Sequence, residues 1–241
     1  MAVAGTGVSA RRGLIHPDGT FSPVTGLSAV LFDMDGTLLD SEKLWDIALD
    51  DLATWLGGAL SSTARDRMVG SSMGRSVAIL HADLGVEADP ESSAAFLTDR
   101  MAELLAGDLI WRPGAAELLA AVHATGLPTA LVTATHRRLT DIALASIGPE
   151  HFTVTVCGDE VPRPKPHPDP YLQATRLLGV PPARSVVIED SPLGVAAAEA
   201  AGCIVIAVPS EVAIEPAPTR TIWPTLEGRT VADLERLARF T

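Results

Sequence analysis

Residues 28–40 of the chain read SAVLFDMDGTLLD, an apolar run followed by two aspartates, Asp33 and Asp35. The apolar run 29–32 is typical of a short strand that is buried on both faces of a parallel sheet. The glycine and threonine after the aspartates interrupt the run, so both carboxylates are expected at the carboxyl end of the strand, where open α/β sheets bind ligands. Paired carboxylates on a rigid strand suit a divalent cation together with a nucleophile or an acid–base group.

An EF-hand calcium loop is one alternative for these aspartates. Such a loop has a glycine at its sixth position and a glutamate at its twelfth. Counted from Asp33, the glycine is Gly36, which comes too early, and the twelfth residue is Leu44. A solvated acidic turn is the other alternative, but it does not explain the buried strand that precedes it. The sequence therefore favours a functional site at the strand end.

The composition limits the class of protein. The chain has 241 residues, 47% of them hydrophobic, which suffices for one large α/β domain or for a domain that carries an insertion. Its 18 basic and 30 acidic residues give a net charge of −12, which argues against broad binding to nucleic acid or to an anionic membrane. Two cysteines, Cys157 and Cys203, provide no disulfide framework.

The first 26 residues are predicted to be a loosely ordered N-terminal extension. No continuous apolar segment follows Arg11 and Arg12, because glycine, histidine, proline and aspartate occur among residues 13–18. Neither a secretory nor a twin-arginine signal is predicted, and the cytoplasm is the expected location.

Residues 42–110 are predicted to form an all-helical insertion. Apolar residues recur at helical spacing in three segments, which begin near Trp45, Ser76 and Ser92. None of this stretch has the pattern of a strand. Trp45 and Trp55 are expected to pack inside the insertion.

The remainder of the chain alternates strands and helices. Strands are expected at 128–132, 152–157, 185–188 and 204–208, with helices between them and a closing helix at 231–240. Repeated strand–helix–strand units form a doubly wound parallel sheet. The predicted fold class is therefore α/β, with a doubly wound, Rossmann-like core made of residues 27–41 and 111–241 and an inserted all-helical cap. Residues 210–224 are expected to be irregular.

Three further strand ends are expected to converge near Asp33, and the residues they carry are Thr133, Lys165, and Glu189 with Asp190. Thr133 follows the strand 128–132, and a hydroxyl there, with free backbone N–H groups behind it, can hold a phosphoryl oxygen or cap the next helix. Glu189 and Asp190 follow three β-branched apolar residues. Because buried carboxylates are costly without a cation, they are predicted to complete a site for a hard metal ion.

Lys165 lies in a proline-rich segment, VPRPKPHPDP, at residues 161–170. Alternating prolines hold the backbone extended and remove donors. Such a segment can be an exposed ligand for a partner domain, or a stiff arm that holds one ammonium over an anionic site. We favour the site role for Lys165 and interpret Arg163 and His167 as surface or loop-anchoring residues.

These motifs together resemble the haloacid dehalogenase-like hydrolases, in the subgroup whose helical cap lies between the first and second motifs. The resemblance extends over residues 27–208 and includes DxDGTLxDS at residues 33–41 and EDSPxGxxAA at residues 189–198. The pattern is close to that of phosphoglycolate phosphatases and β-phosphoglucomutases.

The resemblance implies a role for each motif residue. Asp33 would be the nucleophile that forms an aspartyl-phosphate, and Asp35 would be the general acid and then the general base. Thr133 and the amide of Ala134 would hold the phosphoryl group. Lys165 would offset the charge on Asp33 and on the phosphate.

The resemblance also implies Mg²⁺ as the cofactor. Asp190 would be the main carboxylate ligand beside Asp33, Asp35 would bind through its backbone carbonyl, and Glu189 would act directly or through a neighbouring ligand. Arg75, at a helix start in a glycine-rich turn, is predicted to meet a substrate carboxylate or second phosphate, or else to be exposed. Further candidates for the cleft are Glu42, Lys43, Ser71, Ser72, His136 and Arg137.

The predicted function is that of a Mg²⁺-dependent phosphatase that acts on a small phosphorylated metabolite, as a monomer or small homo-oligomer, without nucleic-acid or membrane partners. A phosphomutase is the first alternative, although mutase relatives carry a histidine where this chain has Trp45. Dehalogenation is disfavoured, because dehalogenases lack an acid at the position of Asp35. A non-catalytic relative has no chemical need for both Asp35 and Lys165.

Overall fold

The structure is a computed structural model that describes residues 13–15, 21–23, 26–68, 71–107 and 109–239. Most of the predicted N-terminal extension lies outside these residues. Its described part is an antiparallel pair of strands, β1 (Gly13–Ile15) and β2 (Phe21–Pro23).

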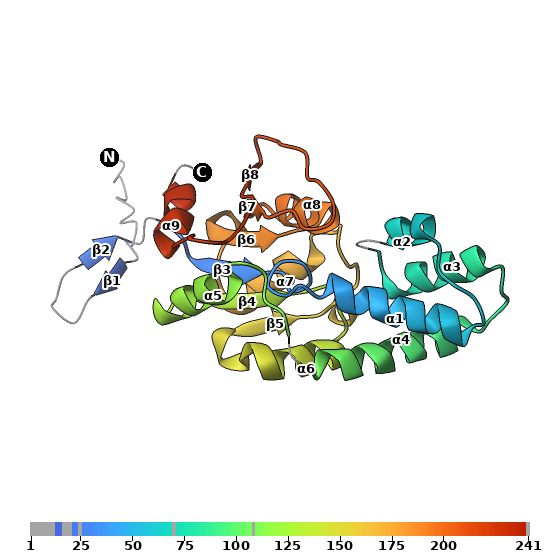
Figure 1. The fold of residues 1–241 in the computed structure, drawn as a ribbon. Coiled ribbons are helices and arrows are strands. Elements are labelled where there is room, and N and C mark those ends of the chain that lie inside the picture. The colour runs from blue at the N-terminus through green and yellow to red at the C-terminus, as the bar shows by residue number, and fades with distance from the viewer. Residues whose placement is uncertain (1–12, 16–20, 24–25, 69–70, 108, 240–241) are drawn as a thin grey trace, which may run out of the picture.

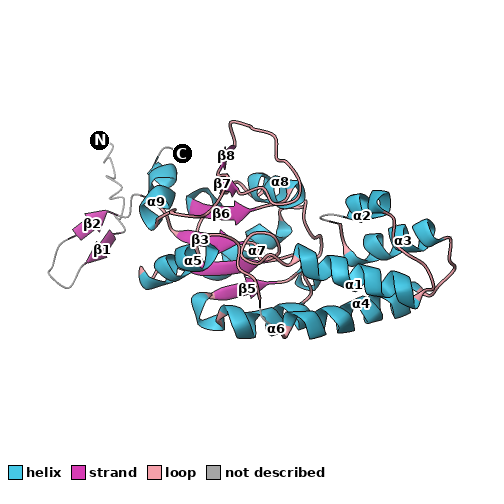
Figure 2. Ribbon diagram, in the orientation of Figure 1, coloured by secondary structure: helices cyan, strands magenta, loops and turns pink. Residues whose placement is uncertain are grey.

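A six-stranded parallel sheet forms the centre of the fold (Figures 1 and 2). In spatial order its strands are β5 (Val154–Val156), β4 (Thr129–Val132), β3 (Ala29–Phe32), β6 (Ser185–Glu189), β7 (Ile204–Ala207) and β8 (Arg220–Ile222). Along β3, Val30 and Phe32 belong to one apolar cluster, whereas Ala29 and Leu31 belong to a second. Because side chains of a strand alternate between faces, β3 is buried on both sides, as its continuous apolar run predicted.

Helices cover both faces of this sheet. The second cluster is completed by residues of α7 (Asp169–Leu178) and α8 (Pro192–Ala200). The first cluster takes residues from α5 (Ala115–Ala124), α6 (Arg137–Ile147) and α9 (Val231–Arg239). This arrangement is the doubly wound α/β fold that the alternating pattern predicted.

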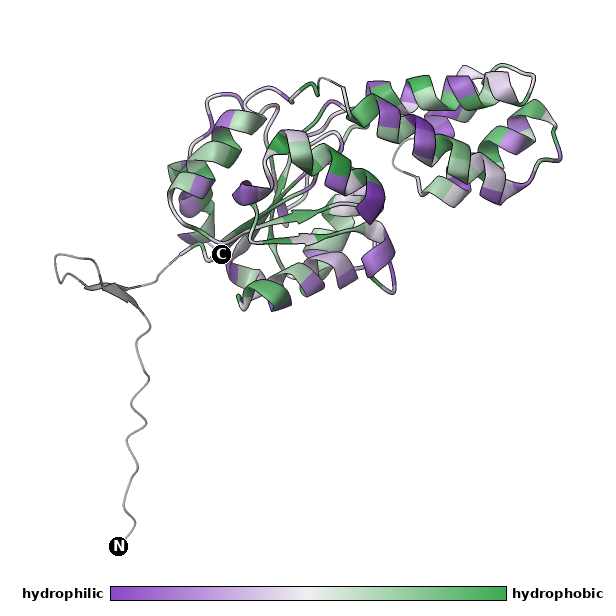
Figure 3. Cartoon of the chain, turned by 90° about the horizontal axis from the view of Figure 1, so that it is seen from below, coloured by the Kyte–Doolittle hydropathy of each residue, from purple (hydrophilic) through white to green (hydrophobic). Residues whose placement is uncertain are grey.

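Between β3 and α5 the described residues form four helices and no strand. They are α1 (Glu42–Trp55), α2 (Ser62–Met68), α3 (Met73–Leu84) and α4 (Pro90–Leu105). This four-helix segment extends beyond the carboxyl edge of the sheet (Figures 1 and 3). None of the helices in the described parts of the chain is long and apolar enough to cross a membrane.

Two connections join the four-helix segment to the sheet, and they lie side by side. The amide of Asp40 donates to the Ile110 carbonyl at 2.7 Å, and the amide of Arg112 donates to the Leu38 carbonyl at 2.8 Å. The segment therefore leaves and re-enters the sheet region at one place.

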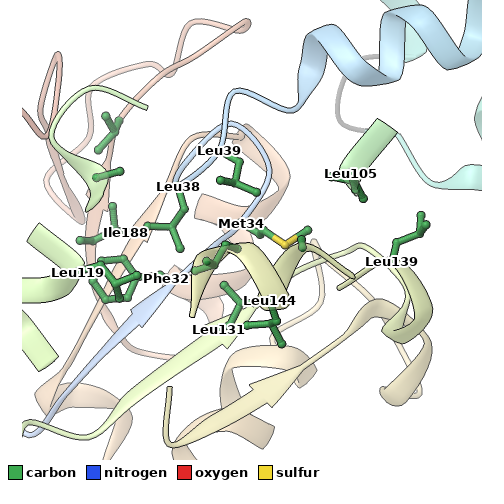
Figure 4. Close-up of a cluster of buried hydrophobic side chains, with 14 of the residues drawn as sticks. Phe32, Met34, Leu38, Leu39, Leu105, Leu119, Leu131, Leu139, Leu144 and Ile188 are labelled. Carbon is green, nitrogen blue, oxygen red and sulfur yellow. The ribbon is translucent and has the colours of Figure 1, made fainter. Parts of the chain in front are cut away.

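An apolar cluster also continues from the sheet toward the four-helix segment (Figure 4). Phe32 and Ile188 contribute from the strands, Met34 from the loop after β3, and Leu105 from α4, and each is almost completely buried. Since apolar burial is the main stabilising term, the segment and the sheet share part of one core.

Three local predictions were incomplete or wrong. The irregular segment 210–224 contains β8, a short edge strand paired with β7. Helix α2 was not predicted. Trp55 does not pack inside the helices, because its side chain is 56% exposed and stacks on Phe96 with ring centroids 5.3 Å apart.

Candidate active site

The polar residues that follow β3, β4 and β6 meet at the carboxyl edge of the sheet. The register pairs Phe32 with Leu131 on one side and with Ile188 on the other. Asp33 continues this register, since its amide donates to the Ile188 carbonyl at 3.1 Å. The pairing brings the side chain of Asp33 beside those of Glu189 and Asp190, as expected from the sequence.

Lys165 places its ammonium among these carboxylates. Its Nζ lies 2.6 Å from Asp33 Oδ1 and 2.6 Å from Glu189 Oε1, and it donates to the Val132 carbonyl at 2.9 Å. These three partners use all three N–H donors of the ammonium. Only 6% of the side chain is exposed, so the proline-rich segment holds Lys165 inside the site and not on the surface.

Glu189 is fully buried, and both of its oxygens are occupied. Besides Lys165, Oε1 accepts a hydrogen bond of 2.8 Å from the Tyr171 hydroxyl. Oε2 accepts from the amide of Asp190 at 3.1 Å and from the amide and hydroxyl of Ser191 at 3.2 and 3.1 Å. Glu189 therefore orders both the ammonium and the loop that carries Asp190.

Asp33, Glu189 and Asp190 each offer a carboxylate oxygen, and these atoms lie within 4.8 Å of one another. Burial, together with the neighbouring Glu189, raises the pKa of Asp190 to about 7. Burial also raises the pKa of Asp33, although Lys165 opposes that effect. Clustered carboxylate oxygens of this kind suit a hard divalent cation, whose charge would relieve their repulsion, so the residues present fit a metal ion.

The loop after β3 approaches Asp190 closely at Gly36. Its φ of +78° lies in the left-handed region, and a Cβ atom there would lie 2.1 Å from Asp190 Oδ2. The hydroxyls of Thr37 (3.4 Å) and Ser210 both donate to the same carboxylate. Only glycine fits this contact.

Asp35 lies apart from the acidic cluster and is surrounded by hydroxyl groups. Its Oδ1 accepts from Ser41 at 2.6 Å, and its Oδ2 accepts from Thr135 at 2.7 Å and from Thr133 at 3.2 Å. Sequence reasoning did not identify Ser41 or Thr135. Ser41 is the last residue of the motif at residues 33–41, and Thr135 lies two residues after Thr133. Thr133 reaches the site as predicted, and Ala134 lines the same cleft.

The floor of a cleft of about 360 Å³ is formed by Asp33, Asp35, Thr133, Lys165 and Asp190. Residues of the four-helix segment line the other side of this cleft. Of the further candidates, Glu42, Ser71, Ser72 and His136 line the cleft. Others do not: Lys43 is exposed and paired with Asp40, and Arg137 is held by Glu160 at 2.8 Å.

Arg75 is exposed on α3 and is not among the residues that line the cleft. Arg65, on the unpredicted helix α2, lines it instead. Its guanidinium lies 3.3 Å from Glu42 Oε2 and also contacts Asp46.

Comparisons with known proteins show which family the chain resembles. The sequence model of haloacid dehalogenase-like hydrolases matches residues 27–202. Protein CbbY of Rhodobacter capsulatus is 34% identical over 196 residues, which cover 77% of this chain and 86% of that protein. Hexitol phosphatase A of Escherichia coli (strain K12) is 34% identical over 191 residues, 74% of this chain and 81% of that protein.

A solved structure is similar over most of the chain. The crystal structure of a CbbY mutant from Rhodobacter sphaeroides in complex with xylulose-(1,5)bisphosphate has a TM-score of 0.75 and 28% sequence identity. It covers 87% of this chain and 99% of its own.

Proposed function

Since the chain belongs to the haloacid dehalogenase-like hydrolases, we propose that it is a Mg²⁺-dependent phosphatase that hydrolyses a phosphate monoester of a small metabolite. The observation that carries the proposal is the contact of Asp33 with Lys165 Nζ, at 2.6 Å, beside Asp190 on the floor of the cleft. A buried carboxylate that is paired with a cation and open to a cleft is suited to nucleophilic attack.

In the first step, we propose that Asp33 attacks the phosphorus atom of the ester. Its Oδ1 is held by Lys165, whereas Oδ2 accepts no hydrogen bond from any described residue and is available for attack. The new bond joins Oδ2 to phosphorus, and the bond from phosphorus to the ester oxygen breaks. Asp35 gives its proton to that oxygen, so the alcohol leaves and an aspartyl-phosphate remains.

In the second step, water attacks the phosphorus atom of the aspartyl-phosphate. Asp35, now a carboxylate, accepts a proton from the water, and the bond from phosphorus to Asp33 breaks. Inorganic phosphate leaves, and both aspartates return to their first state. The hydroxyls of Ser41, Thr133 and Thr135 hold Asp35 in one orientation for both transfers.

We assign the metal site to Asp33 and Asp190. A divalent cation bound there would neutralise charge on the phosphoryl oxygens. Glu189 has both oxygens engaged by other donors, so its proposed role is to position Lys165 and the Asp190 loop. Thr133 and the amide of Ala134 remain the proposed contacts for the phosphoryl group.

We further propose that residues 42–110 form a cap domain, with residues 27–41 and 111–241 as the core. The adjacent connections at Asp40 and Ile110 suit a hinge, because both would bend at one place. Closure would exclude bulk water from the aspartyl-phosphate. X-ray scattering that gave one shape with and without a phosphate analogue would argue against this motion.

The central test is phosphate release from small phosphate esters and one aryl phosphate, with Mg²⁺ and with chelator. Asp33→Asn is expected to abolish release while the protein stays folded. The matched control is Asp50→Asn, which removes an exposed carboxylate of α1 outside the cleft and should leave activity unchanged. Release that survived in Asp33→Asn, or that ignored the chelator, would contradict the proposal.

A further inference from the structure

The wall of the cleft above the phosphoryl site carries an excess of negative charge. Apart from the floor, the ionisable groups that line the cleft, among the described residues, are Glu42, Arg65, His136 and Glu211. Among the described residues of this wall, Arg65 is the one arginine or lysine, and it contacts both Glu42 and Asp46. Its charge is therefore already matched by two carboxylates.

The excess of negative charge on the wall disfavours the binding of a substrate that carries a second acidic group besides the transferred phosphate. On the floor, Lys165 is bound to Asp33 and Glu189, and its field serves the phosphoryl group that is transferred. A carboxylate or second phosphate at the other end of the substrate would face Glu42 and Glu211, with no uncommitted lysine or arginine among the described residues of the wall. Like charges brought together at a binding site weaken binding strongly.

The neutral part of the wall is suited to hydroxyl groups. The Ser71 and Ser76 hydroxyls lie 2.7 Å apart, and each keeps lone pairs that can accept from a ligand. The Thr98 hydroxyl donates to the Ala94 carbonyl at 2.8 Å, so toward the cleft it is an acceptor. The carboxylates of Glu42 and Glu211 are further hydrogen-bond acceptors on this wall. Because acceptors predominate there, the ligand groups that match the wall are O–H donors.

Apolar side chains fill the spaces between these polar groups. The apolar residues that line the cleft from the four-helix segment are Trp45, Leu49, Met68, Met73 and Leu97. Small-molecule sites commonly combine such apolar surface with a few placed polar groups. Carbon-bound hydrogens of a hydroxylated chain or ring would contact this surface.

We propose that the leaving group is an uncharged, polyhydroxylated carbon skeleton, a sugar or a polyol, whose sole anionic group is the transferred phosphate. This inference rests on the proposed phosphatase activity and specifies its substrate class. On this inference, bisphosphates and phosphorylated carboxylic acids are poor substrates of this protein.

The test compares kcat/KM for four esters in the presence of Mg²⁺. They are a hexose monophosphate, a hexitol monophosphate, phosphoglycolate and xylulose 1,5-bisphosphate, with an aryl phosphate as a reporter of the chemistry alone. The better of the two neutral skeletons is expected to exceed both acidic substrates by at least about tenfold.

A charge-insertion variant tests the physical cause. Ser76→Lys adds an ammonium to the wall, and Ser76→Met is the matched control for bulk without charge. Relative to Ser76→Met, Ser76→Lys is expected to raise kcat/KM for the acidic substrates over the neutral ones by about tenfold. Equal selectivity in two folded variants would overturn the electrostatic explanation.

The wild-type panel decides the inference even where a variant fails to fold. Preference for phosphoglycolate or the bisphosphate would overturn the substrate class while the phosphatase function stood. Absence of release from every ester, the aryl phosphate included, would overturn the proposed function and this inference with it.

Discussion

The Tyr171 hydroxyl donates a 2.8 Å hydrogen bond to Oε1 of Glu189. The same oxygen contacts Lys165, whose Nζ also lies 5.2 Å from the centroid of the tyrosine ring. Burial raises the pKa of Tyr171 well above its ordinary value, and Glu189 adds to the effect, so the phenol stays protonated and remains a donor. Tyr171 therefore orients the carboxylate of Glu189, and that carboxylate in turn holds the ammonium of Lys165.

Replacing this tyrosine should affect catalysis as well as stability. Tyr171→Phe is expected to cost about 1–3 kcal/mol of unfolding free energy and to lower kcat about tenfold, because Lys165 loses part of its support. The measurements are urea unfolding and steady-state kinetics.

Thr175→Val is the matched control, since its hydroxyl is buried on the same helix and donates to the Tyr171 carbonyl at 2.9 Å, away from the site. A Tyr171→Phe enzyme with the stability loss but wild-type kcat would remove Tyr171 from any positioning role.

The metal-free protein is expected to lose stability as the pH rises. Burial raises the pKa of Asp190 to about 7, whereas the unfolded chain has the ordinary value near 4. The folded state therefore holds its proton at higher pH than the unfolded state does. The resulting stability is fully present below about pH 4 and is lost as the pH rises through about 7.

Mg²⁺ is expected to reverse this loss by binding the ionised carboxylates. The rise in Tm on adding Mg²⁺ should be larger at about pH 8 than at about pH 5. In Asp190→Asn the response to Mg²⁺ should disappear and the pH dependence should flatten. An equal Tm rise at both pH values would show that the cation binds elsewhere.

Gly36 tests the close contact between the first loop and Asp190. Gly36→Ala should cost about 1–2 kcal/mol for the left-handed backbone, and more because its Cβ meets Asp190. Gly202→Ala provides the control, because Gly202 has nearly the same φ, +77°, with no atom within 4 Å. Calorimetry and Mg²⁺ titration should show a larger stability loss and weaker binding in Gly36→Ala alone. Equal stability losses and equal Mg²⁺ affinities in the two variants would mean that the Asp190 side chain can shift away from the new Cβ atom at little cost.

Thr135 tests the hydroxyl environment of Asp35. Thr135→Val removes the 2.7 Å hydrogen bond to Asp35 and is expected to lower kcat about ten- to a hundredfold, because Asp35, the proposed acid–base group, loses its orientation. Thr140→Val is the control, since that buried hydroxyl donates to the His136 carbonyl at 3.1 Å, and its 3.4 Å contact with Thr135 is to the backbone carbonyl. If both variants had the same kcat, Thr135 would have a structural role only.

The strands and their polar ends were predictable because local sequence determines them. The run 29–32 is apolar on both faces, and the acidic residues after it and after β6 are poor core material. Parallel pairing then brings the strand ends together, whatever the details of the loops. Lys165 was predictable for a related reason, since a proline-rich backbone holds its shape by itself.

The wall of the cleft was less predictable, because tertiary packing determines how the helices are oriented and which of their side chains line the cleft. Arg75 lies in the first turn of α3, after a glycine-rich segment, yet it is exposed and does not line the cleft. Arg65 lies on a seven-residue helix with only two buried residues, too short for a clear periodicity. Similarly, β8 has three residues and depends on pairing with β7, a contact between distant segments.

The register between β3 and β6 couples catalysis to correct folding. Alternate residues of a strand face opposite ways, so a slip of one position would turn Phe32 and Asp33 to the wrong sides. The same slip would break the core and move Asp33 away from Glu189 and Asp190. Molecules that recover activity after refolding are therefore expected to have paired these two strands in their native alignment.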